Sequence, residues 1–388
     1  MSRFFVVSWF FCLYITMIGC VEKQNKQDVI SIDIKSDYPE RLLTLQDVAD
    51  VEYVALETTD EFVTHGAVQA VGKEILLIKN WGDSGDFFLF DRKTGKGIRK
   101  INRLGQGPEE YTQLTDLLLD ERNKEIFVKD NPAKKILVYD YMGNFKRKFG
   151  FHDEGYYIEM FDYDKDHFLC YNGYLPDIEN DMSAYLLVSK LDGTIARTIK
   201  LPYERLETPV IIEREATVTP GFCFATPFDG DWVLMRASSD TLYNYSTDGS
   251  LRPLLIRTPS IHGMDTQVFL FPYLFTSRYY FLQLMEKSMD FKTFKGFPTT
   301  DLVYDTQEKA IYAYKMHNQD FTDNRSFSLS LHPNTTLDSG IWAFKVLQSD
   351  DLISTLNEGK LQGPLKDIVS TLDEESNPVI MLIKRKSE

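Results

Sequence analysis

The chain has 388 residues, with 43 lysines and arginines against 58 aspartates and glutamates, and a formal net charge of −15. This acidic balance argues against a nucleic-acid partner and against a polybasic contact with anionic lipid. The 21 tyrosines and 27 phenylalanines are a high aromatic load, which is typical of packed β-sheets.

The first 19 residues have the pattern of a secretory signal. Phe4 to Gly19 is apolar, follows Arg3 and is too short for a comfortable membrane span. The run ends in Met17-Ile18-Gly19-Cys20, and small or apolar residues directly before a cysteine resemble the lipobox of bacterial lipoproteins. The resemblance implies cleavage before Cys20, lipidation of Cys20 and anchoring without a spanning helix. The alternative is an ordinary cleaved signal followed by a chance cysteine.

We expect residues 20–40 to form a flexible tether and residues 41–388 to form the folded domain. Val21 to Asp37 is polar and has no apolar periodicity. Only one acid, Glu22, closely follows Cys20. The sequence therefore predicts an exported, membrane-anchored protein and leaves open whether it faces the periplasm or the cell surface, with the periplasm preferred.

A strand–turn–strand unit recurs along the chain. It is clearest in Ile136 to Phe149, where strand-forming residues flank a turn in which Gly143 can adopt positive φ. Further copies are Phe87–Ile101, Tyr185–Ile199, Thr241–Leu254 and Asp301–Met316. Successive turns lie about 50 to 60 residues apart, and two more strands precede the first copies; about four strands per period is the signature of a β-propeller blade.

Residues 51–384 accommodate six blades of about 55 residues each, so the sequence predicts an all-β, six-bladed β-propeller. Val51–Glu57 is expected to close the ring by completing the C-terminal blade. The other predicted strands of that blade are Phe327–Pro333, Gly340–Val346 and Pro378–Lys384. A β-sandwich, or several small β domains, is the alternative fold.

Two short helices are predicted inside the last blade, because Asp350–Glu358 and Leu365–Leu372 have apolar residues at helical spacing. Asp350 is the expected N-cap of the first helix. Of the cysteines outside the signal and the anchor, Cys170 and Cys223 lie about one blade apart. An oxidising compartment permits a bond between them, but two buried free thiols are the preferred interpretation.

Three segments carry a family resemblance that spans nearly the whole mature chain. Val51–Asp60, Arg103–Tyr111 and Asn377–Lys384 resemble the six-bladed β-propeller lipoproteins of Bacteroidetes, which are related in shape to NHL-repeat propellers. Their glycine-rich loop commonly reads GQGPGEY, and here Glu109 stands where that pattern has a further glycine. The resemblance implies the fold, but the family has no uniform activity to transfer.

The loop Arg103–Tyr111 is the first candidate binding site, because it should connect two blades at the mouth of the central channel. The side chains that could contact a sugar or peptide are Arg103, Gln106, Glu109, Glu110 and Tyr111. Alternatively, the loop locks the two blades together, with Tyr111 packed as a wedge. On inner strands, the candidates to face the channel are His65, Gln69, Asp116, Glu159, Arg278, Tyr279 and Tyr280; of these, Arg278 and Tyr279 are the predicted ligand contacts.

The sequence contains no metal or catalytic motif. Its six histidines are scattered, and EF-hand, HExxH and GxSxG patterns are absent. We therefore predict no catalytic residue, no metal ligand and no cofactor. The preferred function is non-catalytic binding of a glycan, a peptide or a partner protein. The alternatives are a calcium-assisted envelope hydrolase or lyase that uses channel carboxylates such as Asp116 and Glu159, and a structural subunit of an envelope complex.

Overall fold

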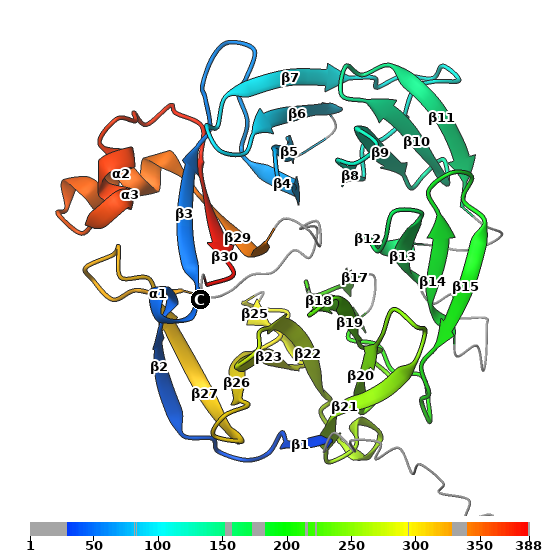
Figure 1. The fold of residues 1–388 in the computed structure, drawn as a ribbon. Helices are drawn as coiled ribbons and strands as arrows, with labels where there is room; N and C mark the ends of the chain where they lie inside the picture. Colours follow the sequence, from blue (N-terminus) through cyan, green and yellow to red (C-terminus); the bar gives the residue numbers. More distant parts are fainter. Residues whose placement is uncertain are drawn as a thin grey trace, which may run out of the picture.

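The computed structural model describes residues 29–80, 82, 84–151, 157–172, 183–213, 216–221, 223–293, 295–327 and 340–386. These residues form six sheets arranged as blades around a central axis (Figure 1). The prediction of an all-β, six-bladed propeller is confirmed, and the sandwich alternative is wrong. The predicted signal, residues 1–19, and Cys20 lie outside the described residues.

The first four blades each contain four consecutive antiparallel strands that run outward from the axis. The first blade contains β4 (Ala67–Val71), β5 (Ile75–Lys79), β6 (Asp86–Asp91) and β7 (Gly97–Asn102). The second contains β8 (Asp116–Asp120), β9 (Glu125–Asp130), β10 (Lys135–Asp140) and β11 (Phe145–Gly150). The third contains β12 (Tyr157–Asp162), β13 (His167–Asn172), β14 (Ser183–Ser189) and β15 (Ile195–Lys200). The fourth contains β18 (Ala225–Phe228), β19 (Asp231–Leu234), β20 (Thr241–Tyr245) and β21 (Leu251–Thr258).

The last two blades complete the ring. The fifth contains β22 (Val268–Phe275), β23 (Tyr279–Glu286), β26 (Thr299–Asp305) and β27 (Ala310–His317). The described part of the sixth contains β29 (Ile341–Leu347), β30 (Val379–Lys384) and β3 (Asp50–Ala55). Because β3 pairs antiparallel with β30, the predicted closure of the ring by the N-terminal strand is confirmed.

One predicted strand of the sixth blade is assigned differently. Within Phe327–Pro333, the described residue Phe327 belongs to β28 (Ser326–Phe327), which pairs with β27 of the fifth blade. Residues 328–339 lie outside the described part of the chain.

The N-terminal segment wraps the outside of two blades. β1 (Ile30–Asp33) adds in parallel to β21, and β2 (Glu40–Thr44) adds in parallel to β27; α1 (Leu45–Val48) then leads into β3 (Figure 1). The tether predicted to extend to residue 40 therefore ends earlier, because Ile30–Asp33 already belongs to a sheet. The apolar Ile32 in β1 is fully buried, which explains why a short strand in a polar stretch stays paired.

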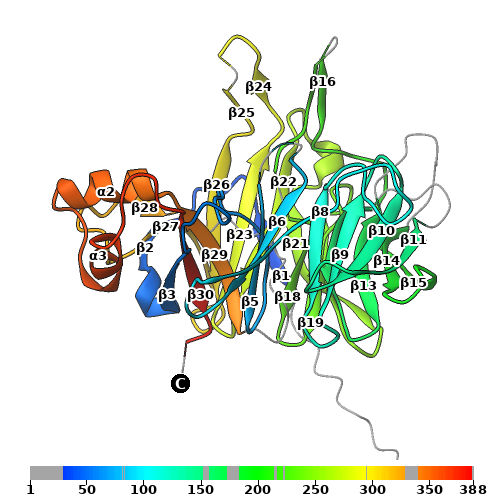
Figure 2. The ribbon, with the colours of Figure 1, turned by 90° about the horizontal axis from the view of Figure 1, so that it is seen from above.

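The two faces of the ring differ in their connections. Because each four-strand blade is antiparallel, the links between blades and the links between second and third strands share one face, which we call the crossover face. Two hairpins project from it: β16–β17 (Ile211–Glu213, Ala216–Val218) and β24–β25 (Met289–Asp290, Lys295–Gly296) (Figure 2). The opposite face carries the tight turns of the repeat and the C-terminus, and we call it the turn face.

Apolar packing between blades explains the strand patterns in the sequence. Middle strands are covered by a blade on each side, so every residue of β9 is buried. Outer strands alternate instead, as in β11, where Lys146 and Lys148 are exposed. Each repeat glycine of the first four blades adopts positive φ in the turn before the outer strand: Gly95, Gly143, Gly193 and Gly249.

The helical insertion covers the ring closure. α2 (Ser349–Asn357) and α3 (Gly363–Val369) lie between β29 and β30, as predicted, and their buried Leu352, Leu365 and Val369 join the core that contains β3 and β30. The predicted N-cap at Asp350 is wrong, because Gln348 holds that position. A short 3₁₀ turn, η1 (Ile261–Gly263), precedes β22. Cys170 and Cys223 are both buried and free, so the predicted free thiols are confirmed.

Candidate functional site

The loop Arg103–Tyr111 lies on the crossover face between the first two blades, and much of it is held against them. The Tyr111 side chain is fully buried; its hydroxyl donates to the Gly85 carbonyl (2.6 Å) and accepts the Arg103 backbone N–H (2.8 Å). Its ring meets Tyr139 edge-on, with centroids 6.2 Å apart. Tyr111 is thus the packed wedge of the alternative interpretation, and its ring and hydroxyl already have protein partners.

The rest of the loop divides into a bonded part and an open part. The Glu110 carboxylate folds back to accept the Gly107 N–H at 2.8 Å, and a Cβ built on Gly105 would lie only 2.0 Å from that carboxylate. The glycines are therefore required by a tight loop. Gln106 and Glu109 are exposed on this face, and Arg103 is exposed as well but donates from Nε to the Gly143 carbonyl at 3.0 Å.

Arg278 and Tyr279 do not join that loop. Arg278 belongs to the β22–β23 connection, which lies on the turn face, and its guanidinium bonds the buried Asp305 carboxylate at 3.0 Å. The ring of Tyr279 lies 4.9 Å beneath the same guanidinium. The expectation that Arg278 projects from an inner strand into the channel is therefore wrong, and the two predicted groups of ligand contacts lie on opposite faces.

The other channel candidates separate into single residues and a polar cluster. His65 precedes the inner strand β4, Gln69 occupies the bulge of β4, and the buried Tyr280 lies in the second strand of its blade. Asp116 and Glu159 instead lie on the inner strands of neighbouring blades.

Lys129 connects this polar cluster. Its ammonium donates to Asp116 Oδ2 at 2.8 Å and to the Ile158 carbonyl of the next blade at 3.0 Å. Glu159 accepts the Phe224 N–H at 3.2 Å, and burial raises the pKa of Glu159 to about 8 although Lys129 opposes the shift. Glu159 can therefore hold a proton near neutral pH.

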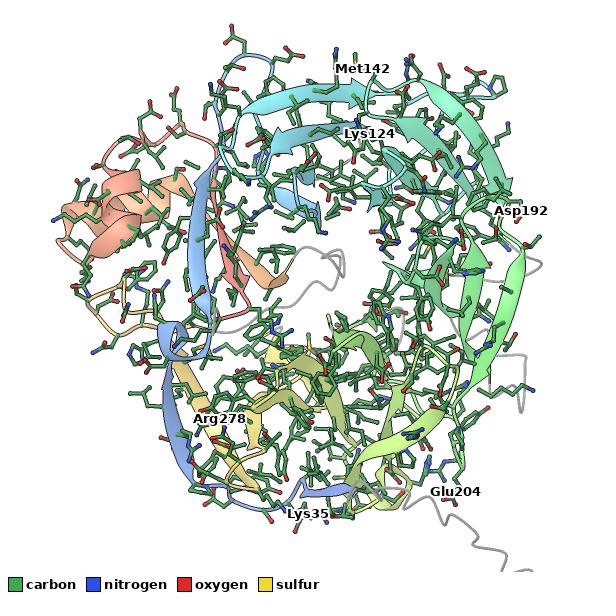
Figure 3. All side chains as sticks on the ribbon, in the orientation of Figure 1. Lys35, Lys124, Met142, Asp192, Glu204 and Arg278 are labelled. Atoms are coloured by element: carbon green, nitrogen blue, oxygen red, sulfur yellow. The ribbon has the colours of Figure 1, made fainter. Side chains whose placement is uncertain are left out.

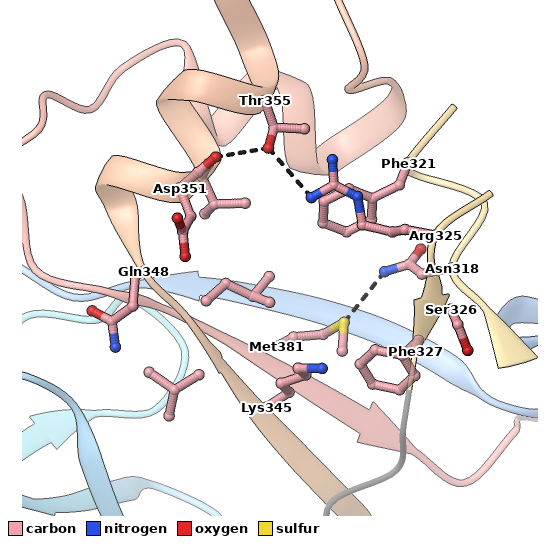
Figure 4. Close-up of a pocket in the computed structure, with 13 residues that line it drawn as sticks. Asn318, Phe321, Arg325, Ser326, Phe327, Lys345, Gln348, Asp351, Thr355 and Met381 are labelled. Atoms are coloured by element: carbon pink, nitrogen blue, oxygen red, sulfur yellow. Dashed lines mark hydrogen bonds between the residues drawn. The ribbon is translucent and has the colours of Figure 1, made fainter. Parts of the chain in front are cut away.

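A largely apolar pocket of about 200 Å³ lies between the fifth and sixth blades (Figure 4). It is formed by the segment after β27, the strand β29 and the first turns of α2. The volume is below the range of about 300 to 1,000 Å³ that holds a drug-sized ligand, so the pocket suits one sugar ring or one side chain of a longer ligand.

The pocket lining contains two cations, two aromatic rings, several aliphatic side chains and one carboxylate, that of Asp351. The Lys345 ammonium lies 4.4 Å from the centre of the Phe327 ring, and the Arg325 guanidinium lies 4.8 Å from the centre of the Phe321 ring (Figure 4). Arg325 is neutralised by Asp323, with Nη2 and Oδ2 2.7 Å apart. Lys345 forms no ion pair with the described residues, and burial lowers its pKa.

A buried hydrogen-bond network holds the base of the pocket in place. Asn318 donates from Nδ2 to the Tyr53 hydroxyl at 2.7 Å and to Met381 Sδ at 3.3 Å. Tyr53 in turn donates to Asp320 Oδ2 at 2.7 Å. The pocket is therefore attached to β3 and β30, the strands that close the ring.

Sequence reasoning missed this pocket. Its available signal was Lys345, near the end of the apolar strand Gly340–Val346, because an unpaired charge is rare in a buried strand. The convergence of Lys345 with Phe327 and with α2 depends on how the fifth blade meets the sixth.

Neither a metal-binding cluster nor a membrane-spanning helix is present in the described residues. No three or more histidine, cysteine, aspartate or glutamate side chains gather there as a set that could hold a metal ion. In the same part of the chain, no helix has both the length and the apolar character needed to span a membrane.

Comparisons with known proteins agree with the fold. A family profile described as "Domain of unknown function (DUF4934)" matches residues 29–384. A Bacteroides fragilis protein described as exported shares 14% identity, with a TM-score of 0.60 over 92% of this chain and 100% of that one. A DUF4221 family member from Bacteroides vulgatus shares 13% identity, with a TM-score of 0.47 over 88% and 98%. A comparison with curated proteins gives no match.

Proposed function

The chain belongs to the DUF4934 family, and from that premise we propose that it is a lipid-anchored envelope protein that binds a carboxylate-bearing ligand without catalysing a reaction. The ligand class is an acidic sugar or the free C-terminus of a peptide. Binding takes place in the pocket between the fifth and sixth blades.

Lys345 is the observation that carries this proposal. A half-buried ammonium with no described counterion has lost hydration without gaining a charge partner, which is costly. A ligand carboxylate offsets that cost, and the rings of Phe327 and Phe321 supply an apolar surface for the body of a sugar or side chain. The ligand enters a site whose walls are already fixed by the Asn318 network, so little ordering is needed on binding.

Isothermal titration of the chain from residue 29 tests this proposal with matched probes. Glucuronate is compared with glucose, and an N-acetylated dipeptide with a free C-terminus is compared with its C-terminal amide. At least one carboxylate probe should bind, and its neutral counterpart should not. Lys345→Met keeps the length of the side chain and should weaken binding roughly tenfold or more, because a charged hydrogen bond is lost.

Lys315→Met is the matched control, since Lys315 lies on the neighbouring strand β27, is exposed and pairs with Glu40. It should bind like the native chain, and thermal unfolding should show that both variants are folded. Equal affinity of native protein and Lys345→Met, or no binding of any carboxylate probe by the native protein, would contradict the proposal.

The direction of the first strand bears on how the proposed lipid anchor at Cys20 would orient the protein. β1 runs parallel to the outer strand β21, so the chain enters the fold from the turn face. An anchor at Cys20 then leaves the crossover face, with its pocket and hairpins, directed away from the membrane. Radiolabelled palmitate should appear in the native protein and be absent from Cys20→Ser. Equal labelling of both proteins would contradict the proposal that Cys20 is lipidated.

An envelope hydrolase or lyase is the second candidate function, and Glu159 is the observation that favours it. A carboxyl group with a pKa near 8 can donate and accept protons at neutral pH, and Asp116 and Lys129 lie in the same cluster. Turnover of an envelope glycan that is abolished in Glu159→Gln but kept in Lys345→Met would establish this candidate over the first.

A further inference from the structure

The outer strands of the first three blades carry positive charge only. Among the described residues, no further strand pairs with β7, β11 or β15, so each forms the outer edge of its sheet along the rim of the propeller (Figure 1). Their 18 residues include seven cations and no aspartate or glutamate, whereas the whole chain has more acids than cations. We call these seven side chains the basic rim: Arg99, Lys100, Lys146, Arg147, Lys148, Arg197 and Lys200.

The other three blades lack this feature. The outer edges of the fourth and fifth blades are covered by β1 and β2. The outer strand of the sixth, β3, carries Asp50 and Glu52 and no cation. Among the described residues, an uncovered outer strand that carries cations and no acid is therefore found only in the first three blades.

The three arginines of the basic rim occupy the same position in their strands, and each reaches the next blade. Arg99 Nη2 lies 3.5 Å from Met142 Sδ, and Arg147 Nε donates to the Leu191 carbonyl at 3.1 Å. Arg197 Nη1 donates to the Tyr245 hydroxyl at 3.1 Å. These contacts tie the blades together and hold the charges in a regular row, in which Met142 and Asp192 mark successive outer turns (Figure 3).

The lysines of the basic rim project outward. Lys100, Lys148 and Lys200 are all exposed, although Lys100 lies 3.3 Å from Asp86 and Lys148 donates to the Pro108 carbonyl. Glu125 pairs with Lys146 and Arg147, so the ion pairs of the basic rim among the described residues involve two acids, Asp86 and Glu125. Asp140 and Asp248 also attract Lys146 and Arg197 without forming ion pairs with them.

Aspartates also occur in the turns that precede these strands. Asp91, Asp140 and Asp192 lie at the turn-face end, where each carboxylate accepts backbone N–H groups of its own turn. They act as turn formers and leave the strand edges positive.

From this arrangement we propose that the basic rim is a docking surface for a flexible acidic polysaccharide that follows the outside of the first three blades. Charged residues on edge strands also prevent edge-to-edge aggregation, and lysine is the common choice. Protection against aggregation does not require an arginine at the same position in adjacent blades. It also does not require the outer strands to lack acidic residues when the protein as a whole is acidic. The contacts to the next blade explain the repeated arginine position, whereas charge complementarity with a polyanion accounts for the exclusion of acids.

The curvature of the basic rim favours a flexible polymer, rather than a flat bilayer, as its binding partner. β7, β11 and β15 follow one another around a convex outer surface (Figure 1), so a plane can touch only part of it at once. A flexible chain with one carboxylate per sugar can contact all three strands, and each contact adds to the avidity.

The test uses polygalacturonate as the anionic probe and dextran as the neutral one, with retention of the chain from residue 29 measured by affinity electrophoresis. The native chain should be retained by polygalacturonate only, and retention should fall as sodium chloride is raised, because exposed charges are screened. The triple variant K100Q/K148Q/K200Q should bind about tenfold more weakly, since three exposed ionic contacts are removed.

The control variant K309Q/K315Q/K366Q removes the same charge from exposed lysines outside the basic rim and should bind like the native chain. No retention of the native chain by polygalacturonate, or equal loss in both triple variants, would overturn the proposal. Binding to vesicles of phosphatidylglycerol as tight as binding to polygalacturonate would overturn it in favour of a lipid surface.

Discussion

Gly193, in the outer turn of the third blade, lies directly against the ring of Phe149 on the outer strand of the second blade. A Cβ built on Gly193 would lie 2.5 Å from Phe149 Cδ2, and the backbone there has φ = +77°. The same turn position contacts the preceding blade at Gly143 beside Ile101 and at Gly249 beside Arg197. The repeat glycine therefore serves the turn and the junction between blades together.

Gly193→Ala should lower the free energy of unfolding by about 2 to 4 kcal/mol. The alanine would have to adopt a left-handed backbone conformation, and its Cβ would clash with the ring of Phe149. Urea denaturation of the chain from residue 29 measures the loss. Gly263→Ala is the control, since a Cβ there meets no atom within 4 Å and the backbone has no positive φ; it should change stability little. Equal stability of the two variants would mean that the turn does not pack against Phe149.

Asn377→Asp should weaken the closure of the ring. Asn377 Nδ2 donates to the carbonyls of Glu57 (2.7 Å) and Phe62 (2.6 Å), and its Oδ1 accepts the Thr64 N–H (2.8 Å). A carboxylate cannot donate to two buried carbonyls, so we expect a loss of about 3 kcal/mol or more. Limited proteolysis should then cut the variant faster between residues 57 and 64, and an unchanged cleavage rate would contradict the role given to Asn377.

Ile32→Ala tests whether β1 belongs to the folded domain. Ile32 is fully buried against the fourth blade, and removing such a side chain costs about 2 to 5 kcal/mol. Leu42→Ala, in the neighbouring outer strand β2, is the control because Leu42 is 68% exposed and should have a small effect. Thermal unfolding compares the two; if Ile32→Ala is as mild as the control, β1 is a detachable part of the tether.

The stability of the protein should depend on pH through Glu159. Burial raises its pKa from 4.5 to about 8, so the folded state binds this proton more tightly than the unfolded state. The stabilisation is complete below about pH 4.5 and is lost as the pH rises toward 8. Glu159→Gln cannot ionise, so its stability relative to the native protein should increase between those values and stay constant above pH 8.

Urea midpoints at pH 5, 6.5, 8 and 9 measure this difference. Glu375→Gln, at an exposed position, is the control and should differ from the native protein by a nearly constant amount. The same constant difference for Glu159→Gln would show that Glu159 is not held in a low-dielectric site, and it would also weaken the catalytic alternative.

Most of the architecture could be predicted from the sequence, because each blade is formed by consecutive residues of the chain. Strands that are adjacent in the chain pair with each other, and the turn residues that join them, such as Gly143, act within a few positions. Residues 136–149 therefore predict β10 and β11 without reference to the rest of the chain. The closure through β3 could also be inferred, since a ring without a partner for Val51–Glu57 would leave an open edge.

The candidate binding sites could not be predicted in the same way, because they depend on contacts between residues that are far apart in the chain. Arg278 looked like a channel residue because aromatic strand residues surround it in the sequence, but Asp305 holds it on the turn face. Tyr111 looked available for a ligand, but the fold buries it. Lys345 became notable only when Phe327 and α2 were placed around it.

Hydrogen bonding and turn chemistry between near neighbours specify the blades, their number and the strand that joins the two ends of the ring, so the amino-acid sequence was enough to predict them. The wrapping of two blades by β1 and β2, the formation of the Lys345 pocket and the row of cations along the first three blades became apparent from the folded chain. Those features come from segments far apart in the chain, whose contacts depend on how whole blades pack around the axis.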